Sequence, residues 1–352
     1  MQYKLLSVSK WPGLADINIG DYIQSLAAAQ YYPHVDGFID RDMELKDYDG
    51  EPCKVIMNGW YMHDPKNWPP SERITPLFVA FHLNVLAKEV LLSPPSLSYL
   101  RQHAPIGCRD LNTLELLRNN GVEAYFSGCL TLTLGEKYRS ESKDERTYIV
   151  NPVYEVHLGG KSNILKAVVE IFRHPRDILT LYPKYRTFAR PDRGWISKVL
   201  ETALYYREYT RFFSREIIVG STYIGHEDAG YKSRFDSDRA RLEEAERLIR
   251  LYARARLVIT SRIHCALPCL GLETPVVYIE KARDAEVSSC RLGGLRDFFN
   301  RMKMENGRLI PDFDLPFPIT MRNIPVNKDS WRPYAEALKR RCEEFVKADR
   351  RA

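Results

Sequence analysis

One stretch in the last third of the chain constrains the fold more than any other. Residues 257–260 form an apolar, largely β-branched run, and a short helix pattern follows from Arg262 to Gly271. A second apolar run, residues 276–279, comes directly after Pro275. A strand, a tight turn, a helix and a second strand in this order are typical of a parallel sheet, because parallel strands need a crossover connection. This stretch therefore predicts an α/β fold.

Arg262 and His264 stand at the start of the predicted helix. Ligands of open α/β sheets lie outside the carboxyl ends of the strands, which is where both side chains fall. A permanent cation, a titratable imidazole and the N–H groups of a helix start together suit an anionic substrate that needs a proton moved. We predict that Arg262 binds the anion and that His264 is the acid/base group. The competing interpretation is structural, with the arginine paired to a carboxylate and the histidine packed in the core.

The same alternation of strands and helices occurs twice along the chain. It runs through residues 1–135, is interrupted by a polar, charged stretch, and restarts in residues 146–325. Since 352 residues exceed the size at which one core stops growing, two domains are expected. We predict two Rossmann-like, doubly wound domains facing a cleft, which resembles the glycosyltransferase-B arrangement. A final amphipathic helix within residues 330–350 is expected to pack back on the first domain.

Individual elements are predicted from apolar periodicity and from helix caps. Predicted strands cover residues 3–9, 54–57, 77–81, 90–92, 105–108, 122–126, 147–151 and 216–222, and predicted helices cover residues 21–32, 111–119, 163–173 and 237–254.

Composition excludes several other classes of protein. The net charge of +6 is mild, and no module or basic tail typical of nucleic-acid-binding proteins occurs, so we expect no nucleic-acid partner. No apolar run approaches the roughly 18 residues of a membrane span, and residues 1–10 lack the pattern of a signal peptide. Seven cysteines without a Cys-x-x-Cys pair favour a reduced, cytoplasmic protein.

Cys265 and Cys269 lie four residues apart on the predicted helix, next to His264. A zinc site needs further ligands at recognisable spacing, and the sequence supplies none. We therefore expect no metal site, and we interpret both thiols as small buried groups that pack the helix on the sheet.

Three short motifs resemble one known family. Asn18-Ile19-Gly20-Asp21, Gly107-Cys108-Arg109-Asp110 and Ser261-Arg262-Ile263-His264 together look like the polysaccharide pyruvyltransferases, with the last motif the most specific. These enzymes transfer the pyruvyl unit of phosphoenolpyruvate onto two hydroxyls of a sugar and form a cyclic ketal. The resemblance implies His264 as the acid/base, and phosphoenolpyruvate as the donor substrate with no further cofactor. It also implies a sugar or lipid-linked oligosaccharide acceptor, in the biosynthesis of a surface polysaccharide or exopolysaccharide such as a capsule.

The first domain is expected to hold the acceptor sugar. Four acceptor-binding residues are predicted on its strand ends and loops: Asn18, Asp21, Asn58 and Arg109. Asp110 is predicted as a second catalytic residue, which orients or deprotonates a sugar hydroxyl. The competing interpretation of Asp110 is a cap for the helix that begins at Leu111.

The second domain is expected to hold the donor. Phosphoenolpyruvate carries a phosphate and a carboxylate, so its site needs more than one cation, and the planar fork of an arginine can hold either group. Besides Arg262, we predict His226 and Arg291 as donor-binding residues, because each follows a predicted strand. Gly159-Gly160 precedes a predicted helix as a phosphate cradle would, but it lacks the known glycine-rich patterns.

Residues 173–215 are unusually basic and aromatic, with eight Arg and two Lys against four acids. One interpretation is a surface for a lipid-diphosphate acceptor or for anionic headgroups, which would give the protein a peripheral contact with the cytoplasmic face of a membrane. The preferred interpretation is a helical excursion whose aromatic residues are core and whose arginines are solvated.

Two other functions compete with pyruvyl transfer. A glycosyltransferase of the same architecture would use a nucleotide sugar, and Glu280, at the end of a predicted strand, leaves a ribose-binding acid open. A non-catalytic sugar-binding protein would keep its properties after His264→Ala. We prefer pyruvyl transfer because of the three motifs.

Overall fold

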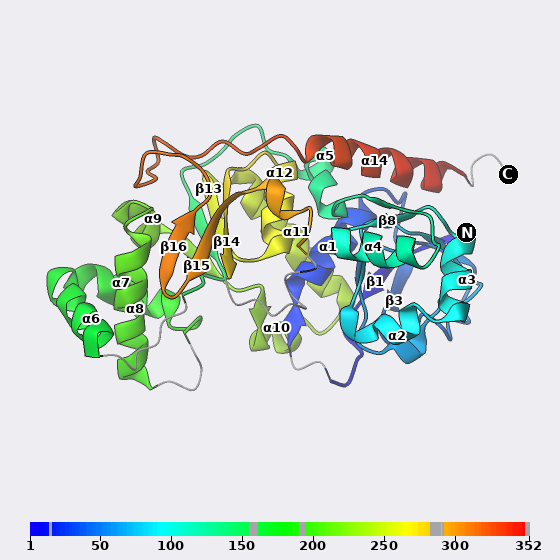
Figure 1. The fold of residues 1–352 in the computed structure, drawn as a ribbon, viewed down its shortest axis with the longest axis horizontal. Helices are drawn as coiled ribbons and strands as arrows, with labels where there is room; N and C mark the ends of the chain where they lie inside the picture. The colour runs from blue at the N-terminus through cyan, green and yellow to red at the C-terminus, as the bar shows by residue number, and fades with distance from the viewer. Residues whose placement is uncertain (14–15, 155–160, 190–193, 282–289, 291, 349–352) are drawn as a thin grey trace.

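The computed structural model describes residues 1–13, 16–154, 161–189, 194–281, 290 and 292–348. It shows an elongated α/β molecule with two Rossmann-like units, each built on a mainly parallel sheet (Figure 1). The sheet of the N-terminal unit lies at one end, the sheet of the C-terminal unit lies in the middle, and a group of helices forms the other end. The predicted α/β fold with two such units, consistent with a glycosyltransferase-B-like arrangement, is confirmed.

The N-terminal unit contains two groups of parallel strands that continue one another. The first group has the order β3 (Gly37–Asp40), β1 (Gln2–Ser7), β4 (Cys53–Ile56), β6 (Ile74–Leu77), and the second has the order β5 (Gly59–Tyr61), β7 (Phe81–Leu83), β8 (Ile106–Cys108), β9 (Ala124–Phe126). Backbone hydrogen bonds from Met57 to Leu77 (2.8 Å) and from Gly59 to Ala80 (3.2 Å) connect the groups. Since all these strands run in parallel, their carboxyl ends share one edge.

The C-terminal unit has one larger sheet. Its order is β11 (Thr222–Ile224), β10 (Thr147–Val150), β13 (Leu257–Thr260), β14 (Val276–Lys281), β15 (Asn300–Glu305), β16 (Arg308–Pro311). All neighbours are parallel except β15 and β16, which pair as an antiparallel hairpin. β10 and β13 are buried along their whole length, as expected for parallel strands that are covered on both faces. The strand order reverses at β10, and ligands of such sheets bind at the reversal point.

Helices cover both sheets. In the N-terminal unit they are α1 (Ile19–Ala29), α2 (Lys88–Leu91), α3 (Pro94–Gln102), α4 (Leu111–Asn119) and α5 (Gly135–Tyr138), with the 3-10 turn η3 (Leu130–Thr133) before α5. The C-terminal unit follows with α6 (Lys161–Arg173), α7 (Pro175–Tyr185), α8 (Trp195–Tyr209), α9 (Arg215–Gly220), α10 (Ala229–Arg234), α11 (Asp238–Arg254) and α12 (Ile263–Gly271), and α14 (Arg332–Lys347) ends the fold.

The two units share one hydrophobic core. α1 packs against α11 and α12, and η3 packs against α12. Leu26 of α1, Leu132 of η3, Leu248 of α11 and Leu267 of α12 all belong to the same cluster of buried side chains. A short antiparallel ladder between β2 (Ile17–Asn18) and β12 (Glu227–Asp228) adds a backbone connection. The units are therefore joined through side chains and backbone together.

Two glycines allow the backbones of η3, α5 and α12 to touch. A Cβ atom on Gly271 would lie 2.2 Å from the carbonyl oxygen of Leu132, and one on Gly135 would lie 1.9 Å from the carbonyl oxygen of Gly271. A methyl group cannot approach an oxygen so closely without moving one of the two backbones. Gly271, which the sequence marks as a helix end, is therefore required by packing between the units.

The C-terminal helix α14 lies along the N-terminal unit (Figure 1). Lys54 Nζ donates a hydrogen bond to the carbonyl oxygen of Phe345 (2.6 Å), and the Arg341 guanidinium lies 4.4 Å from the ring centroid of Tyr125. Leu338 is buried in the shared core. The chain thus returns from the second unit to the first.

Most predicted elements are present, but three predicted strands are wrong. Residues 77–81 span the break between β6 and β7, where Ala80 has a positive φ of 53°. Residues 90–92 lie at the end of α2, and most of residues 216–222 form α9, whose first turn is capped by Ser214. Short apolar runs of this kind do not distinguish a strand from a buried helix.

The basic, aromatic segment is mainly helical. α7 and α8 bury Tyr185, Tyr205 and Tyr209 in a second hydrophobic cluster. Arg215 pairs with the buried carboxylate of Asp177. These contacts support the interpretation of a helical excursion in which most aromatic residues form a core, while Trp195 at the start of α8 is exposed.

Candidate active site

A cavity of about 400 Å³ lies between the two units. Hollows of about 410 and 430 Å³ elsewhere on the described surface are as large, so volume does not identify the site. The lining residues identify it, because this cavity brings together members of all three motifs described in the sequence. Those members are Asn18, Asp21, Arg109, Ser261, Arg262, Ile263 and His264.

Arg262 and His264 reach the cavity because β13 ends immediately before them. Thr260 Oγ1 accepts a hydrogen bond from the backbone N–H of Arg262 (3.0 Å), and α12 begins at Ile263. Both side chains line the cavity, at the N-terminal end of the helix. Partial positive charge from the helix dipole therefore adds to the charge of the guanidinium at this wall.

The guanidinium of Arg262 is held bidentately by the carboxylate of Glu227, which belongs to β12. This is the pairing that the structural interpretation of Arg262 describes. The pair faces the cavity, however, and the side chains are 27% and 44% exposed. A partly exposed ion pair contributes only about 0–1 kcal/mol. An anionic ligand with the same forked geometry can therefore replace the carboxylate.

The N-terminus of α1 lies against His264. A Cβ atom on Gly20 would lie 3.1 Å from both Cβ and Nδ1 of His264, and 2.9 Å from Oδ1 of Asn18. The Asn18 oxygen already accepts the capping hydrogen bond from the Gly20 N–H (2.9 Å). The glycine of the first motif therefore makes room for the histidine of the third, although they are far apart in the sequence.

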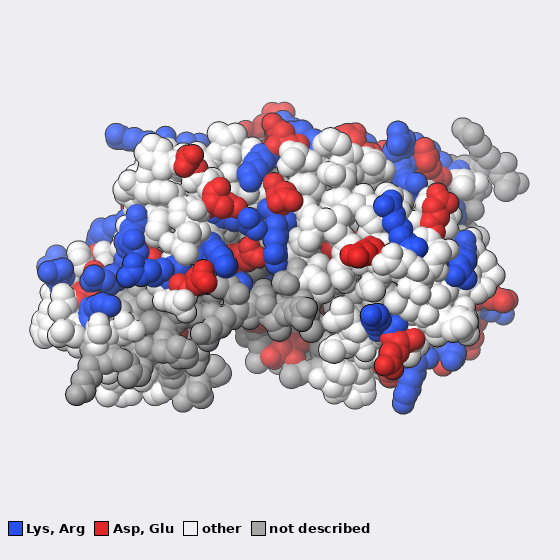
Figure 2. Space-filling view, in the orientation of Figure 1, with Lys and Arg blue, Asp and Glu red and all other residues white. Residues whose placement is uncertain are grey.

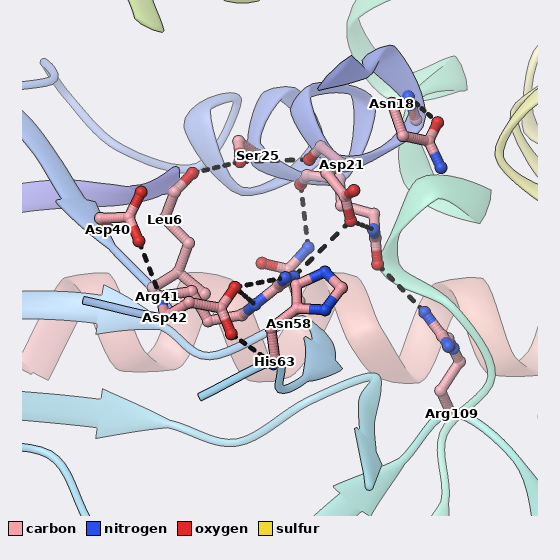
Figure 3. Close-up of polar contacts among 12 residues, drawn as sticks. Leu6, Asn18, Asp21, Ser25, Asp40, Arg41, Asp42, Asn58, His63 and Arg109 are labelled. Carbon is pink, nitrogen blue, oxygen red and sulfur yellow. Dashed lines mark hydrogen bonds and ion pairs between the residues drawn. The ribbon is translucent and has the colours of Figure 1, made fainter. Parts of the chain in front are cut away.

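On the side of the N-terminal unit, a network of ionised groups connects the cavity residues Asp21 and Arg41 to the buried Asp42 behind them (Figure 3). Arg41, which follows β3, donates to Asp42 Oδ2 through Nη2 (2.8 Å) and lies 3.6 Å from Asp21 Oδ1. Asp42 Oδ1 in turn accepts a hydrogen bond from the backbone N–H of His63 (2.5 Å). Burial opposes the charge of Arg41, but these carboxylates outweigh it, so the pKa of Arg41 is raised. Arg41 is thus a fixed cation beside Asp21.

Asp21 is held by α1 and by side chains from two strand ends. Gln24 Nε2 donates to Asp21 Oδ1 (3.1 Å), and Arg109 Nη1 donates to Gln24 Oε1 (3.2 Å), so Gln24 links the two cavity residues (Figure 3). Burial raises the pKa of Asp21, and the charges of Arg41 and Arg109 oppose this shift. A carboxylate with a raised pKa beside a cavity is suited to accept a proton.

Aromatic rings surround His63 at the cavity. The ring of Trp11 stacks on that of His63, with centroids 4.2 Å apart and an interplanar angle of 4°, and the Trp60 ring centroid lies 4.5 Å away. Arg41 lies over the Trp60 ring at 5.3 Å. Burial is the main cause of the lowered pKa of His63. An indole and an imidazole therefore give this wall flat surfaces that a sugar ring can pack on.

His226 lies behind the Arg262–Glu227 pair. Its side chain is fully buried, its Nε2 is 2.8 Å from the hydroxyl of Tyr252, and its backbone N–H donates to Asn151 Oδ1 (2.7 Å). Burial, and secondarily the charge of Arg262, lower its pKa to about 3. His226 lines the cavity as a neutral imidazole, so it can offer a hydrogen bond to a donor substrate but no positive charge.

Two residues predicted for the acceptor side do not line the cavity. Asp110 is fully buried: it caps α4 through the N–H of Thr113 (2.9 Å), and it lies 2.6 Å from Nδ1 of His82. The structure thus shows Asp110 as a helix cap, and its burial favours that interpretation over the catalytic one. Asn58 is also buried and donates to the carbonyl oxygen of Gln24 (2.9 Å), so it supports α1 instead of contacting an acceptor.

Arg291 and Gly159-Gly160 lie outside the described residues. Of the other predicted donor-side and acceptor-side residues, Arg262, His264, His226, Asn18, Asp21 and Arg109 line the cavity.

Sequence reasoning missed several cavity residues. The charged and aromatic ones are Asp16, Arg41, Trp60, His63, Glu227, Tyr278 and Lys281. Arg41 and Lys281 each lie at the carboxyl end of a strand, where ligands of α/β sheets bind. The same rule predicted Arg109. It would have predicted these two residues if the strand at 37–40 had been recognised and the strand at 276–279 had been extended. Trp60 and His63 lie in or just after β5, a three-residue strand that has no apolar alternation to detect.

The described lining of the cavity carries mixed charge with a surplus of cations. Its permanent cations are Arg41, Arg109, Arg262 and Lys281, and its carboxylates are Asp16, Asp21 and Glu227. Glu227 forms an ion pair with Arg262, and Asp42 forms one with Arg41. A dianionic ligand can exchange partners with these ion pairs.

The described residues contain neither a cluster suited to a metal ion nor a helix suited to span a membrane. No group of three His, Cys, Asp or Glu side chains there is arranged to hold a metal ion. No helix in the same ranges is long and apolar enough to cross a membrane.

Comparison with known proteins agrees with the motifs that meet at the cavity. A family model described as polysaccharide pyruvyl transferase matches residues 18–280, which includes Asn18 and the edge of β14 that bears Glu280. No significant match was found among curated proteins or among solved structures. The family match favours pyruvyl transfer over the nucleotide-sugar and binding-protein alternatives. The chain belongs to the polysaccharide pyruvyl transferase family.

Proposed function

We propose that this protein transfers the pyruvyl group of phosphoenolpyruvate onto two hydroxyls of a sugar, forming a cyclic ketal on a precursor of a surface polysaccharide or exopolysaccharide. The observation that supports it most is the close approach of Gly20 to His264 at a cavity that also contains Arg262, Arg109 and Arg41. That contact joins the first and third of the three motifs in one site, although more than half of the chain separates them.

The donor binds at the start of α12. Phosphoenolpyruvate carries a phosphate and a carboxylate, and each needs a cation or a cluster of N–H donors. Arg262 exchanges the Glu227 carboxylate for one of these groups, and Lys281, at the carboxyl end of β14, contacts the other. The neutral imidazole of His226 contributes a hydrogen bond from below the pair.

His264 delivers a proton to the methylene carbon of the donor. The C=C electrons form the new C–H bond, the central carbon becomes electrophilic, and a sugar hydroxyl attacks it and loses its proton. The C–O bond to phosphate then breaks with its electron pair on phosphate, and the second hydroxyl adds to the same carbon and loses its proton. Two protons leave the hydroxyl oxygens: one replaces the proton that His264 gave to carbon, and the other is taken up by the departing phosphate. General acid–base catalysis of this kind contributes about 10²–10⁴-fold.

Asp21 is the base for the acceptor. It lies at the cavity on the same helix as Gly20, its pKa is raised by burial, and Arg41 holds it from behind. The rings of Trp60 and His63 pack against the sugar and position its hydroxyl pair. Asp21 thus takes the role that the sequence assigned to Asp110.

Phosphate release from phosphoenolpyruvate tests the proposal. The protein is incubated with phosphoenolpyruvate and a panel of acceptors that includes galactose and N-acetylmannosamine derivatives, free and lipid-linked, and the product is checked by NMR for a ketal methyl group. His264→Asn should abolish release, whereas His34→Asn, a change of a histidine on an exposed surface, should not. Stabilisation by nucleotide sugars together with no effect of phosphoenolpyruvate would refute the proposal.

A further inference from the structure

The helix α6 has an apolar side on which Ile164, Leu165 and Phe172 are exposed in the part of the chain that the structure describes. At about 100° per residue, Ile164, Leu165, Val168, Val169 and Phe172 fall on one arc of about 140°. Leu165 and Phe172 are 65% and 81% exposed, while Ala167 and Glu170 on the other side are buried. An amphipathic helix of a water-exposed surface normally presents the opposite arrangement, so this arc is the side of α6 that needs a partner.

The exposed apolar side chains extend to the two helices packed on α6. Leu179 of α7 is 74% exposed, and Trp195, the first residue of α8, is 70% exposed with Ile196 beside it. Of the 12 exposed large hydrophobic side chains in the described part of the protein, six lie between residues 164 and 196. Because α6, α7 and α8 pack together at the end of the molecule remote from the N-terminal sheet, these side chains are concentrated on one end (Figure 1).

The same three helices carry a one-sided charge. Every acidic residue described in them is buried: Glu170, Asp177, Glu201 and Glu208. Their exposed ionised side chains are basic, and include Lys166 and Arg173 on α6, and Arg176 on α7. Lys and Arg side chains are accordingly visible over this end of the molecule in Figure 2. On α6, Lys166 and Arg173 are seven residues apart, as are Leu165 and Phe172. A basic stripe, Lys166 and Arg173, therefore runs beside an apolar stripe, Leu165 and Phe172.

A basic hollow adjoins the apolar arc. It has a volume of about 410 Å³ and lies between α6, α8 and the turn from β15 to β16. Its cations are Lys166, Arg207, Arg211 and Arg308, and the carboxylate of Glu208 is occupied by Arg211 and by the backbone N–H of Leu309. Lys166 lines the hollow while its neighbour Leu165 points to solvent, so sites for a phosphate and for an acyl chain are next to each other.

We propose that α6, α7 and α8 dock the protein on the surface of an anionic lipid bilayer. Phe172, Leu165 and Trp195 enter the boundary between headgroups and acyl chains, and the cations around Lys166 bind lipid phosphates. A second copy of the chain is disfavoured as the occupant, because a symmetric contact would place these basic surfaces opposite each other. The inference does not depend on the reaction catalysed at the cavity.

Vesicle sedimentation tests the docking surface. The full-length protein is mixed with vesicles of phosphatidylcholine and phosphatidylglycerol, or of phosphatidylcholine alone, without substrates. We expect binding to the anionic vesicles only, weakened by salt. Leu165→Ser/Phe172→Ser and Lys166→Glu/Arg173→Glu should each reduce the partition coefficient about tenfold or more. The matched changes Leu86→Ser/Val90→Ser and Lys88→Glu, on exposed positions of the N-terminal unit, should leave it unchanged.

Tryptophan fluorescence is a second measurement, and it leaves the apolar and basic side chains of α6 unchanged. Vesicle binding should shift the emission of Trp195 to shorter wavelength, and Trp195→Phe should remove the shift although four other tryptophans remain. Failure to bind anionic vesicles would overturn the proposal, as would equal binding to neutral vesicles or equal loss in the control variants. A wild-type dimer that the Leu165→Ser/Phe172→Ser change converts to a monomer would assign the surface to self-association instead. Phosphate release with a water-soluble acceptor should be the same in all these variants, so failure of the docking proposal and of the proposed function are distinguishable.

Discussion

Gly20→Ala is the sharpest test of how the two units build the site. The added methyl carbon would lie 3.1 Å from Cβ and Nδ1 of His264 and 2.9 Å from Oδ1 of Asn18. Carbon atoms in good contact are about 3.5–4.0 Å apart. The variant must therefore open the contact between α1 and α12 by roughly half an ångström or more, and the imidazole of His264 is the movable group at the interface.

The expected effect is large on catalysis and small on stability. Alanine stabilises a helix over glycine by up to about 1 kcal/mol, which offsets a weakened Asn18 cap of similar size, so the free energy of unfolding should change by less than about 1 kcal/mol. A misplacement of about 1 Å at a reacting group costs up to about a hundredfold in rate. We expect kcat to fall by about ten- to a hundredfold, with the KM for phosphoenolpyruvate changed less.

Steady-state phosphate release and urea denaturation measure the two effects. Gly220→Ala, at the last residue of α9, is the matched control because a Cβ atom there has nothing within 4 Å. It should leave kcat unchanged and change the free energy of unfolding by no more than about 1 kcal/mol. If Gly20→Ala keeps kcat within about threefold of wild type, a difference worth less than 1 kcal/mol, then His264 is not positioned by this contact and its role as proton donor loses its structural basis.

Three further predictions separate structural from chemical roles. Asp110→Ala should lower the free energy of unfolding by about 2–4 kcal/mol, because it removes a helix cap and the buried partner of His82, without a selective loss of kcat per folded molecule. The pKa of His226 is lowered from 6.5 to about 3, so its contribution to stability is present above pH 6.5 and is lost as the pH falls. Urea denaturation should show a loss of about 2 kcal/mol between pH 7 and 5, absent in His226→Gln; an equal loss in the variant would contradict this. Glu227→Gln should lower the KM for phosphoenolpyruvate about two- to fivefold by releasing Arg262, and a raised KM would show instead that Glu227 orients the guanidinium.

Local patterns were sufficient to predict the edge of the C-terminal sheet. The run at 257–260, the helix after it and the strand at 276–279 appear as β13, α12 and β14. This prediction succeeded because buried parallel strands are continuous apolar runs, and because a strand that ends at Thr260 must release Arg262 and His264 at its carboxyl end.

Tertiary contacts explain what local patterns left open. Asp110 has the same sequence signature whether it caps a helix or acts on a substrate, and only its burial beside His82 separates the two. Gly20 and Gly271 looked like ordinary loop and helix-end glycines. Their actual constraint is a neighbour from the other unit, which no local window contains.

The strand predicted at residues 216–222 was wrong for a different reason. Its Ile217 and Ile218 are buried in α9, a six-residue helix, and burial on one side gives the same apolar run as a strand. Over so few residues the two periodicities cannot be told apart.

The shared core has a consequence for how this polypeptide can be divided. Leu26, Leu132, Leu248 and Leu267 shield one another across what would otherwise be a domain boundary. A fragment ending near residue 140, expressed alone, would leave its share of that surface in water and should aggregate, whereas co-expression of both fragments should restore a soluble heterodimer. Random mutagenesis should likewise find that substitutions of these shared-core residues reduce the yield of folded protein and its activity together. The reason is that α1 and α12, which join the two units, also carry Gly20 and His264.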